Sequence, residues 1–199
     1  MKNMLLIGLM ALAPMTFAQA EAIPGKPAPA FEVKDAAGKT HTLAESKGKW
    51  LVLEWYNKDC PFVKKHYDSG NMQSLQKTYT AKNVVWYSVN SAAKGKEGNE
   101  TPAEALKTMT EKKSAANAVL LDESGTMGKA YGAKTTPHMF VINPEGVVVY
   151  AGGIDDNDSS NPKVIPTSKN YVTAALDAGM SGKKVEMASA RAYGCSVKY

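Results

Sequence analysis

Apolar runs along the chain have the length and spacing of strands in a buried sheet. Residues 50–56 and 84–89 are almost continuously apolar, which is typical of strands covered on both faces. Residues 118–121 form a shorter run of the same kind. Residues 138–142 and 147–150 flank an Asn-Pro-Glu-Gly sequence, and this pattern predicts a β-hairpin.

Helical patterns separate these strands. Residues 61–79 predict a helix that breaks or kinks around Gly70. Thr101 and Pro102 have the residue types of a helix start, and we expect that helix to reach about Ser114. Two further helices are predicted at residues 126–131 and 171–180.

The order of these elements indicates the fold class. Residues 31–33 and 40–43 lie on either side of a Gly-containing turn and predict an N-terminal hairpin. Strands then alternate with helices, and a hairpin and a helix close the pattern. This order predicts an α/β fold with a central sheet covered on both faces.

The first twenty residues have the pattern of an export signal. Lys2 gives a charged start, residues 4–13 are mostly apolar, and Ala18-Gln19-Ala20 is a small-x-small cleavage site. The apolar run is too short to span a bilayer. We therefore predict a Sec-type signal peptide over residues 1–20, cleaved after Ala20.

Export predicts where the rest of the chain works and how it is organised. We expect a periplasmic or secreted protein with no membrane span in the mature chain. Residues 21–181 predict one domain, and residues 182–199 predict a C-terminal tail that carries Cys195. A disulfide can persist in an oxidising compartment of this kind.

The distribution of charge argues against one class of partner. The formal net charge is +5, but the lysines are scattered and Arg191 is the only arginine. Nucleic-acid recognition favours a concentrated basic face that contains Arg. We therefore predict a solvated basic surface and no nucleic-acid partner.

The two cysteines, Cys60 and Cys195, are the main candidates for chemistry. Cys60 lies between the strand at residues 50–56 and Pro61, which begins a helix. The free N–H groups and the positive dipole end of a helix N-terminus favour the thiolate, which is the reactive form of cysteine. Lys64, one helical turn further on, should add to this effect. The alternative is an inert buried thiol.

Several short segments resemble one known family. They are residues 27–31, the buried strand that ends at Cys60-Pro61, Thr135-Thr136-Pro137, and Pro144-Glu145-Gly146. Together they resemble the redoxin or peroxiredoxin-like family of the alkyl hydroperoxide reductase/thiol-specific antioxidant type. The ending Gly194-Cys195-Ser196-Val197-Lys198 resembles a branch with a C-terminal cysteine. The resemblance implies a thioredoxin-like fold: a central mixed β-sheet flanked by helices, an N-terminal β-hairpin and a C-terminal tail.

The chain departs from the two standard active sites of such folds. A dithiol thioredoxin has a second cysteine three residues after the first, where this chain has Val63. A peroxiredoxin has Pro seven residues and Thr three residues before its cysteine, where this chain has Leu53 and Asn57. These departures leave both a peroxide and a protein disulfide open as the substrate.

The resemblance also implies roles for the residues of the site. Cys60 would be the nucleophile, and Cys195 would be its resolving or disulfide partner. Pro137 matches the cis-proline that faces the active cysteine, which would leave the Thr136 backbone free to pair with an extended substrate. Pro61 would complete the substrate-facing surface. The Cys60–Cys195 link could equally be a permanent structural bridge, or Cys195 could meet a partner protein.

Glu54 is a carboxylate inside an otherwise apolar strand. It matches the buried acid of thioredoxins, and burial would raise its pKa towards neutrality, which suits proton transfer to or from sulfur. The alternative is a Glu that pairs with a nearby Lys or lies on a half-exposed face.

The histidines and one acidic segment give weaker signals. We expect His41 to lie on the surface hairpin, His66 to point away from Cys60, and His138 either to approach the site or to face the core. A copper site built from Cys60, Cys195 and His138 is a minor alternative. Residues 155–159 fail the EF-hand pattern and predict a solvated loop.

We therefore predict an exported thiol-dependent oxidoreductase without a metal or a dissociable cofactor. A thiol-containing protein would supply electrons, and the substrate would be a peroxide or a protein disulfide. The alternatives are a monothiol disulfide exchanger that acts on a partner protein, a non-enzymatic metal-handling or structural module, and a degenerate scaffold that only binds proteins. The sequence predicts no particular oligomeric state.

Overall fold

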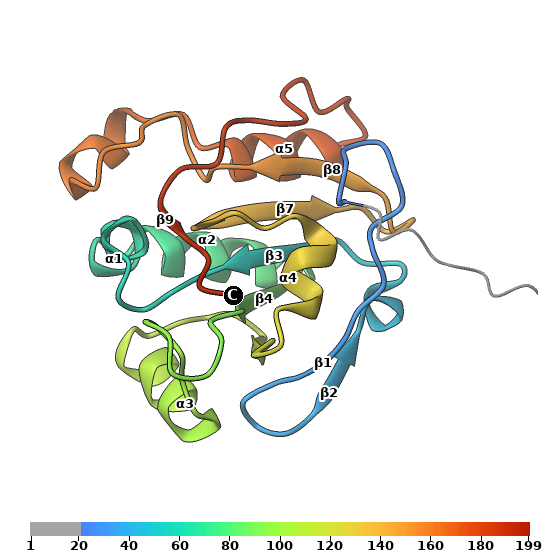
Figure 1. Ribbon diagram of the computed structural model, residues 1–199. Coiled ribbons are helices and arrows are strands. Elements are labelled where there is room, and N and C mark those ends of the chain that lie inside the picture. Colours follow the sequence, from blue (N-terminus) through green and yellow to red (C-terminus); the bar gives the residue numbers. More distant parts are fainter. Residues whose placement is uncertain (1–20) are drawn as a thin grey trace, which may run out of the picture.

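The computed structural model describes residues 21–199 and contains a five-stranded mixed sheet (Figure 1). The strand order is β5-β4-β3-β7-β8. Three strands are parallel: β3 (Leu51–Trp55), β4 (Val85–Asn90) and β5 (Ala118–Leu121). The remaining two, β7 (His138–Ile142) and β8 (Val148–Gly152), form the antiparallel hairpin. The predicted signal peptide, residues 1–20, lies outside the described residues.

The sheet separates two hydrophobic cores, and β3 supplies alternate residues to each. Val52, together with Tyr56 just after the strand, packs on the side covered by α1 (Pro61–Asp68), α2 (Asn71–Thr80) and α5 (Tyr171–Met180). Leu53 and Trp55 pack on the other side, with α4 (Thr126–Tyr131) and the N-terminal segment. All five β3 residues are buried, because β3 is the central strand and both of its faces are covered.

The helix boundaries follow local sequence rules. Gly70 has a φ of +78°, in the left-handed region, and the chain there breaks the helix predicted over residues 61–79 into α1 and α2. Helix α3 (Pro102–Glu111) begins with a capping box: the Thr101 side chain accepts from the Glu104 N–H, and the Glu104 carboxylate accepts from the Thr101 N–H. This helix ends three residues before the predicted Ser114.

The predicted N-terminal hairpin is present as β1 (Glu32–Lys34) and β2 (Thr40–Thr42), which pair antiparallel. A short 3₁₀ helix, η1 (Leu43–Ser46), follows it. A second one, η2 (Pro162–Thr167), lies in the loop between β8 and α5. Within the part of the chain that the structure describes, no helix has the length and apolar content needed to cross a bilayer.

The C-terminal segment returns across the fold after α5. Its backbone first runs beside β8, where the Ala151 N–H donates to the Ala188 carbonyl at 3.1 Å. It then forms β9 (Cys195–Ser196), which pairs antiparallel with β6 (Thr135–Thr136). Figure 1 shows this segment in red, passing from α5 over the ends of β7 and β3. The tail therefore brings the second cysteine back to the centre of the domain.

Candidate active site

Cys60 lies where the central strand passes into α1. It is the N-cap residue of that helix, and Pro61 occupies the first helical position on the exposed surface. The Cys60 side chain is 0% exposed. The backbone N–H of Val63, in the first turn, interacts with the Cys60 sulfur. The predicted setting at a helix N-terminus is confirmed.

The segment that faces Cys60 is the Thr136–Pro137 peptide. This peptide bond is cis, which confirms the conformation expected for Pro137. The Cys60 thiol donates to the Thr136 carbonyl, with the sulfur and oxygen 3.0 Å apart. The buried Thr136 side-chain hydroxyl also interacts with the Cys60 sulfur. Thr136 therefore presents both an acceptor and a donor to the sulfur.

The tail brings Cys195 to this same peptide. In the β6–β9 pairing, Cys195 lies opposite Thr136 and Ser196 opposite Thr135. The Val197 N–H then donates to the Lys134 carbonyl at 3.1 Å. The Thr136 backbone, which we expected to be free for a substrate, thus pairs with the protein's own C-terminal strand.

Gly194 makes this close approach possible. A Cβ at this position would lie 2.0 Å from the Thr136 carbonyl oxygen, and the residue has a φ of +134°. Both features exclude a larger residue without displacement of the tail. The Gly that precedes Cys195 is therefore required for the observed register.

The two thiols have opposite acid–base properties. Burial favours the neutral form of Cys60, but hydrogen bonds from the Cys195 thiol, from the Thr136 hydroxyl and from the Val63 N–H lower the pKa of Cys60 below its usual value. Burial, the hydrogen bond donated to Cys60 and the negative charge of Cys60 raise the pKa of Cys195. The arrangement favours a Cys60 thiolate beside a protonated Cys195.

A match to one family model covers residues 24–151, and that model describes the AhpC/TSA family. The chain belongs to the AhpC/TSA family. The match includes Cys60, Thr136 and Pro137 and ends before the tail that carries Cys195. A search of curated proteins gave no match.

Solved structures show the fold of this AhpC/TSA protein to be thioredoxin-like. A Chlorobium tepidum crystal structure named as a putative thiol:disulfide interchange protein DsbE is 25% identical, with a TM-score of 0.52 over 64% of this chain and 83% of that one. The thioredoxin domain of a thiol-disulfide oxidoreductase from Bacteroides vulgatus is 19% identical, with a TM-score of 0.52 over 72% and 96%. An uncharacterised conserved protein from Geobacillus kaustophilus is 26% identical, with a TM-score of 0.75 over 97% and 98%.

Glu54 is fully buried beneath α1 in this AhpC/TSA protein. Burial raises the pKa of Glu54 to about 7, against the lowering effect of hydrogen bonds from four side chains. These donors lie at 2.9–3.2 Å on α1, α2 and β4: Tyr67, Gln76, Trp86 and Ser88. Glu54 is on the same side of the sheet as Cys60, but its hydrogen bonds all go to this set. The alternative of a Glu–Lys pair is therefore wrong.

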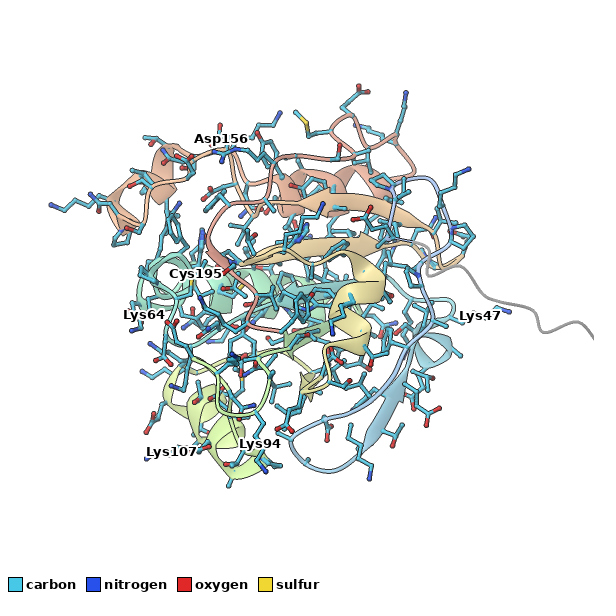
Figure 2. All side chains as sticks on the ribbon, in the orientation of Figure 1. Lys47, Lys64, Lys94, Lys107, Asp156 and Cys195 are labelled. Carbon is cyan, nitrogen blue, oxygen red and sulfur yellow. The ribbon has the colours of Figure 1, made fainter. Side chains whose placement is uncertain are left out.

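Lys64, which we expected to lower the pKa of Cys60, does not lie at the thiol site. Lys64 is exposed and is not among the main influences on the pKa of Cys60. Figure 2 shows Lys64 towards the edge of the molecule and Cys195 within its body. The next residue, Lys65, is buried and points to a different partner, Asp155.

The histidines do not form part of the thiol site. His138 is buried and its ring stacks on Phe140, which belongs to the core on the α4 side of the sheet. His41 is buried against Tyr87 and Asp35, so the expectation of a surface histidine is wrong. No three His, Cys, Asp or Glu side chains are grouped to hold a metal ion among residues 21–199.

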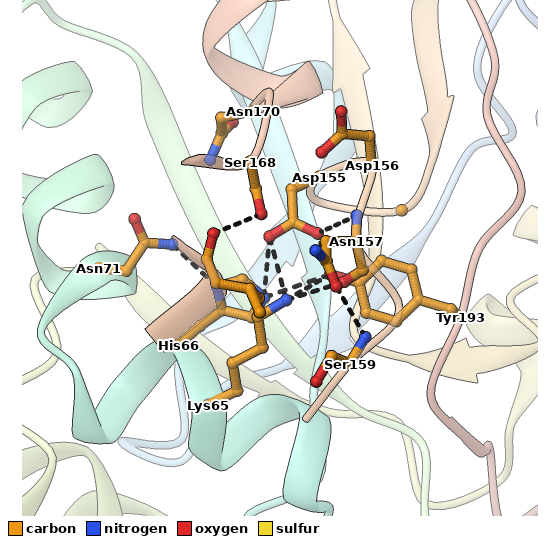
Figure 3. Close-up of polar contacts among 12 residues, drawn as sticks. Lys65, His66, Asn71, Asp155, Asp156, Asn157, Ser159, Ser168, Asn170 and Tyr193 are labelled. Carbon is orange, nitrogen blue, oxygen red and sulfur yellow. Dashed lines mark hydrogen bonds and ion pairs between the residues drawn. The ribbon is translucent and has the colours of Figure 1, made fainter. Parts of the chain in front are cut away.

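A buried polar cluster beside the site was missed by the sequence interpretation (Figure 3). Asp155 is 3% exposed and accepts hydrogen bonds from Lys65 and Tyr193, so the expectation of a solvated loop is wrong for this residue. His66, which we expected to point away from Cys60, lies in the same cluster, 3.4 Å from the Tyr193 hydroxyl. Nothing in the spacing of these residues along the chain indicates that they meet.

Proposed function

We propose that this AhpC/TSA-family protein carries out thiol–disulfide exchange with Cys60 as the nucleophile and Cys195 as the resolving thiol. The observation that carries the proposal is the pairing of Cys195 with Thr136, the residue whose carbonyl contacts the Cys60 sulfur. Two thiols with opposite pKa shifts, held at one peptide, can form and break one reversible disulfide.

The reaction begins on Cys60. Its thiolate attacks one sulfur of a substrate disulfide, the substrate S–S bond breaks, and the leaving thiolate takes up a proton. Cys195 then gives up its proton and attacks the Cys60 sulfur. The Cys60–Cys195 bond forms, and the second substrate thiol is released. The substrate gains two electrons, and a partner protein with two thiols then supplies two further electrons that reduce the Cys60–Cys195 disulfide, while its own thiols are oxidised to a disulfide.

Access to Cys60 requires a movement in this scheme. Cys60 is 0% exposed while β9 is paired with β6. The tail must leave the Thr136 edge before a substrate reaches the sulfur, and an extended substrate segment would then pair with that edge in its place. Resolution is the return of Cys195 to the same position.

We favour a disulfide over a peroxide as the substrate. Leu53 and Asn57 replace the Pro and Thr of a peroxiredoxin site. Asn57 is committed elsewhere, because its amide donates to the Glu97 carbonyl at 3.2 Å and its Oδ1 accepts from the Asp59 N–H at 2.8 Å. The thiol:disulfide interchange name of the Chlorobium tepidum structure supports the same choice.

The proposal includes export and a role for Glu54. The signal-peptide pattern of residues 1–20 supports a periplasmic or secreted protein, in which the Cys60–Cys195 disulfide would not be reduced by cytosolic thiols. Glu54, with a pKa of about 7, would hold the proton that leaves or enters the site at neutral pH.

One experiment separates the substrate classes. The fully reduced protein is exposed either to oxidised glutathione or to hydrogen peroxide, and mass spectrometry follows the loss of two hydrogens that marks the Cys60–Cys195 link. We expect rapid link formation with oxidised glutathione and little with micromolar peroxide. The reverse order would replace exchange with peroxidase activity. A link that forms with neither oxidant would contradict both activities, and a link that forms but cannot be reduced again would leave a structural bridge.

A further inference from the structure

The tail is anchored just before Cys195 by a tyrosine in a buried ionic cluster. The Tyr193 hydroxyl donates to one carboxylate oxygen of Asp155, and the other oxygen is 3.2 Å from the Lys65 Nζ. Lys65 also donates to the Asn157 carbonyl at 2.8 Å. Its Nζ lies 5.4 Å from the centre of the Tyr193 ring. Figure 3 shows the three side chains converging from α1, from the loop after β8 and from the tail.

Because the cluster is buried, its charged groups are stabilised by one another and not by water. The side chains of Lys65 and Asp155 are 0% and 3% exposed, so each charge depends on its protein partners in place of water. The Asp155 oxygen that accepts from Tyr193 has one further donor, the Asn157 N–H at 3.0 Å. Loss of the Tyr193 hydroxyl would leave a buried carboxylate short of a donor, which is a costly change.

The position of Tyr193 connects this cluster to the thiol pair. Tyr193 lies two residues before Cys195, and Phe62 lies two residues after Cys60. Their rings pack edge to face with centroids 5.8 Å apart. Gly194, between the anchor and the thiol, is fixed against the Thr136 carbonyl. The path from the buried cluster to the Cys195 sulfur is therefore short and constrained.

The tail has a second anchor after Cys195. The Tyr199 ring covers Gly125 and Gly128, where an added Cβ would lie 2.5 Å from ring atoms or the hydroxyl oxygen. The Tyr199 hydroxyl donates to the Ala133 carbonyl at 2.7 Å. Of the two anchors, Tyr193 is the one that contacts the helix of Cys60.

We propose that Tyr193, held by Asp155 and Lys65, is a positioning residue that sets the effective concentration of the Cys195 thiol at Cys60. This inference rests on the proposed exchange function. The hydrogen bonds of the Tyr193 hydroxyl all go to the buried cluster of Asp155, Lys65 and His66, so Tyr193 acts by fixing where the tail begins its approach to Thr136. A loosened anchor would leave Cys60 more accessible and make Cys195 a poorer resolving thiol.

The test uses Tyr193→Phe in the full chain, because the substitution keeps the ring against Phe62 and removes only the hydroxyl. Tyr79→Phe is the matched control: the Tyr79 hydroxyl also donates to a carboxylate, that of Asp177 on α5, which is not part of the cluster around Asp155. Each variant is equilibrated with mixtures of reduced and oxidised glutathione, and mass spectrometry gives the effective concentration of the two thiols. The alkylation rate of Cys60 by iodoacetamide is measured in parallel.

We expect Tyr193→Phe to lower the effective concentration about tenfold or more and to raise the Cys60 alkylation rate, while Tyr79→Phe changes neither. Phe62→Leu, which keeps the hydroxyl and removes the ring contact, should give a smaller change in the same directions. A Tyr193→Phe protein with a lowered melting temperature and an unchanged effective concentration would overturn the inference. A wild-type protein that forms no Cys60–Cys195 disulfide would instead overturn the proposed function.

Discussion

Cys60 lies in regular secondary structure, whereas Cys195 lies in an irregular segment. Cys60 sits on regular structure, between the central strand and the first turn of α1, and its N–H donor comes from that helix. Cys195 sits on an irregular tail whose only strand, β9, has two residues. The scaffold thus fixes the position of the nucleophile, while tail contacts bring the second thiol to it and supply the first of the hydrogen bonds that lower the pKa of Cys60. The contrast separates the placement of the nucleophile, which the domain supplies, from resolution, which the tail supplies.

The largest expected effect comes from removing each thiol in turn. Cys60→Ser should abolish exchange completely, because the nucleophile is lost. Cys195→Ser should keep the first step and accumulate a mixed disulfide between Cys60 and glutathione. Mass spectrometry after treatment with oxidised glutathione distinguishes the two variants. Equal inactivity, with no mixed disulfide in Cys195→Ser, would contradict the division of roles.

The next largest effect concerns the seating of the tail. Gly194→Ala places a Cβ 2.0 Å from the Thr136 oxygen, so β9 cannot keep its register. We expect the rate of Cys60–Cys195 disulfide formation to fall roughly 100-fold. Gly182→Ala is the matched control, since it also has a positive φ, +73°, but no atom lies within 4 Å of its added Cβ.

Gly182→Ala should lower the free energy of unfolding by about 1 kcal/mol and leave the rate of disulfide formation unchanged. Stopped-flow mixing of the reduced proteins with oxidised glutathione gives both rates. If the two glycine variants slow the reaction equally, the close contact at Thr136 has no part in resolution.

A smaller effect concerns Glu54 and the pH dependence of stability. A carboxyl whose pKa is raised from 4.5 to about 7 on folding binds more protons in the folded state between those values, so its contribution to stability is lost as pH rises through that window. Glu54→Gln has no such loss. The free energy of unfolding of the variant, minus that of wild type, should therefore rise by roughly 1–3 kcal/mol from pH 5 to pH 8.

Urea titrations of both proteins at the two pH values measure this difference. His66 and His138 act in the opposite direction, because burial lowers the pKa of each to about 4 and stability is lost as pH falls from 6.5 to 4. Both histidines are present in the two proteins, so their effect cancels in the comparison. A pH-independent difference would show that Glu54 is ionised throughout this range.

The smallest expected effect is that of Lys64→Met. Lys64 is exposed, so its charge is screened by water and should leave the pKa of Cys60 unchanged. Cys195→Ala should raise that pKa, because it removes a hydrogen bond to the thiolate. The pH dependence of Cys60 alkylation, followed by mass spectrometry, measures both. A raised Cys60 pKa in Lys64→Met would contradict this and show that Lys64 stabilises the thiolate.

Elements fixed by local pattern could be predicted from the sequence. The helix at residues 126–131, the helix at residues 171–180 and the central strand match the structure because their apolar spacing and flanking residues are informative on their own. Cys60 at a helix N-terminus followed from the same rules. The cis bond at Pro137 followed from the resemblance to a known family.

Long-range polar contacts could not be predicted in this way. The tail has weak periodicity, and its path depends on two tyrosines that meet residues far away in the sequence. Lys64 and Lys65 are neighbours of the same type, and only the three-dimensional position of Asp155 decides which of them is buried. Asp155 itself belongs to a polar run with the composition of a solvated loop. The partners of a buried charge come from the fold, which a local pattern does not contain.

The central claim is that the Cys60–Cys195 disulfide turns over. Its reduction potential, measured by mass spectrometry after equilibration in glutathione buffers, tests this most directly. We predict a link that forms and is reduced with a potential above about −300 mV, in the range of exchange-active disulfides. A potential well below about −300 mV would identify a permanent structural bridge and contradict the account.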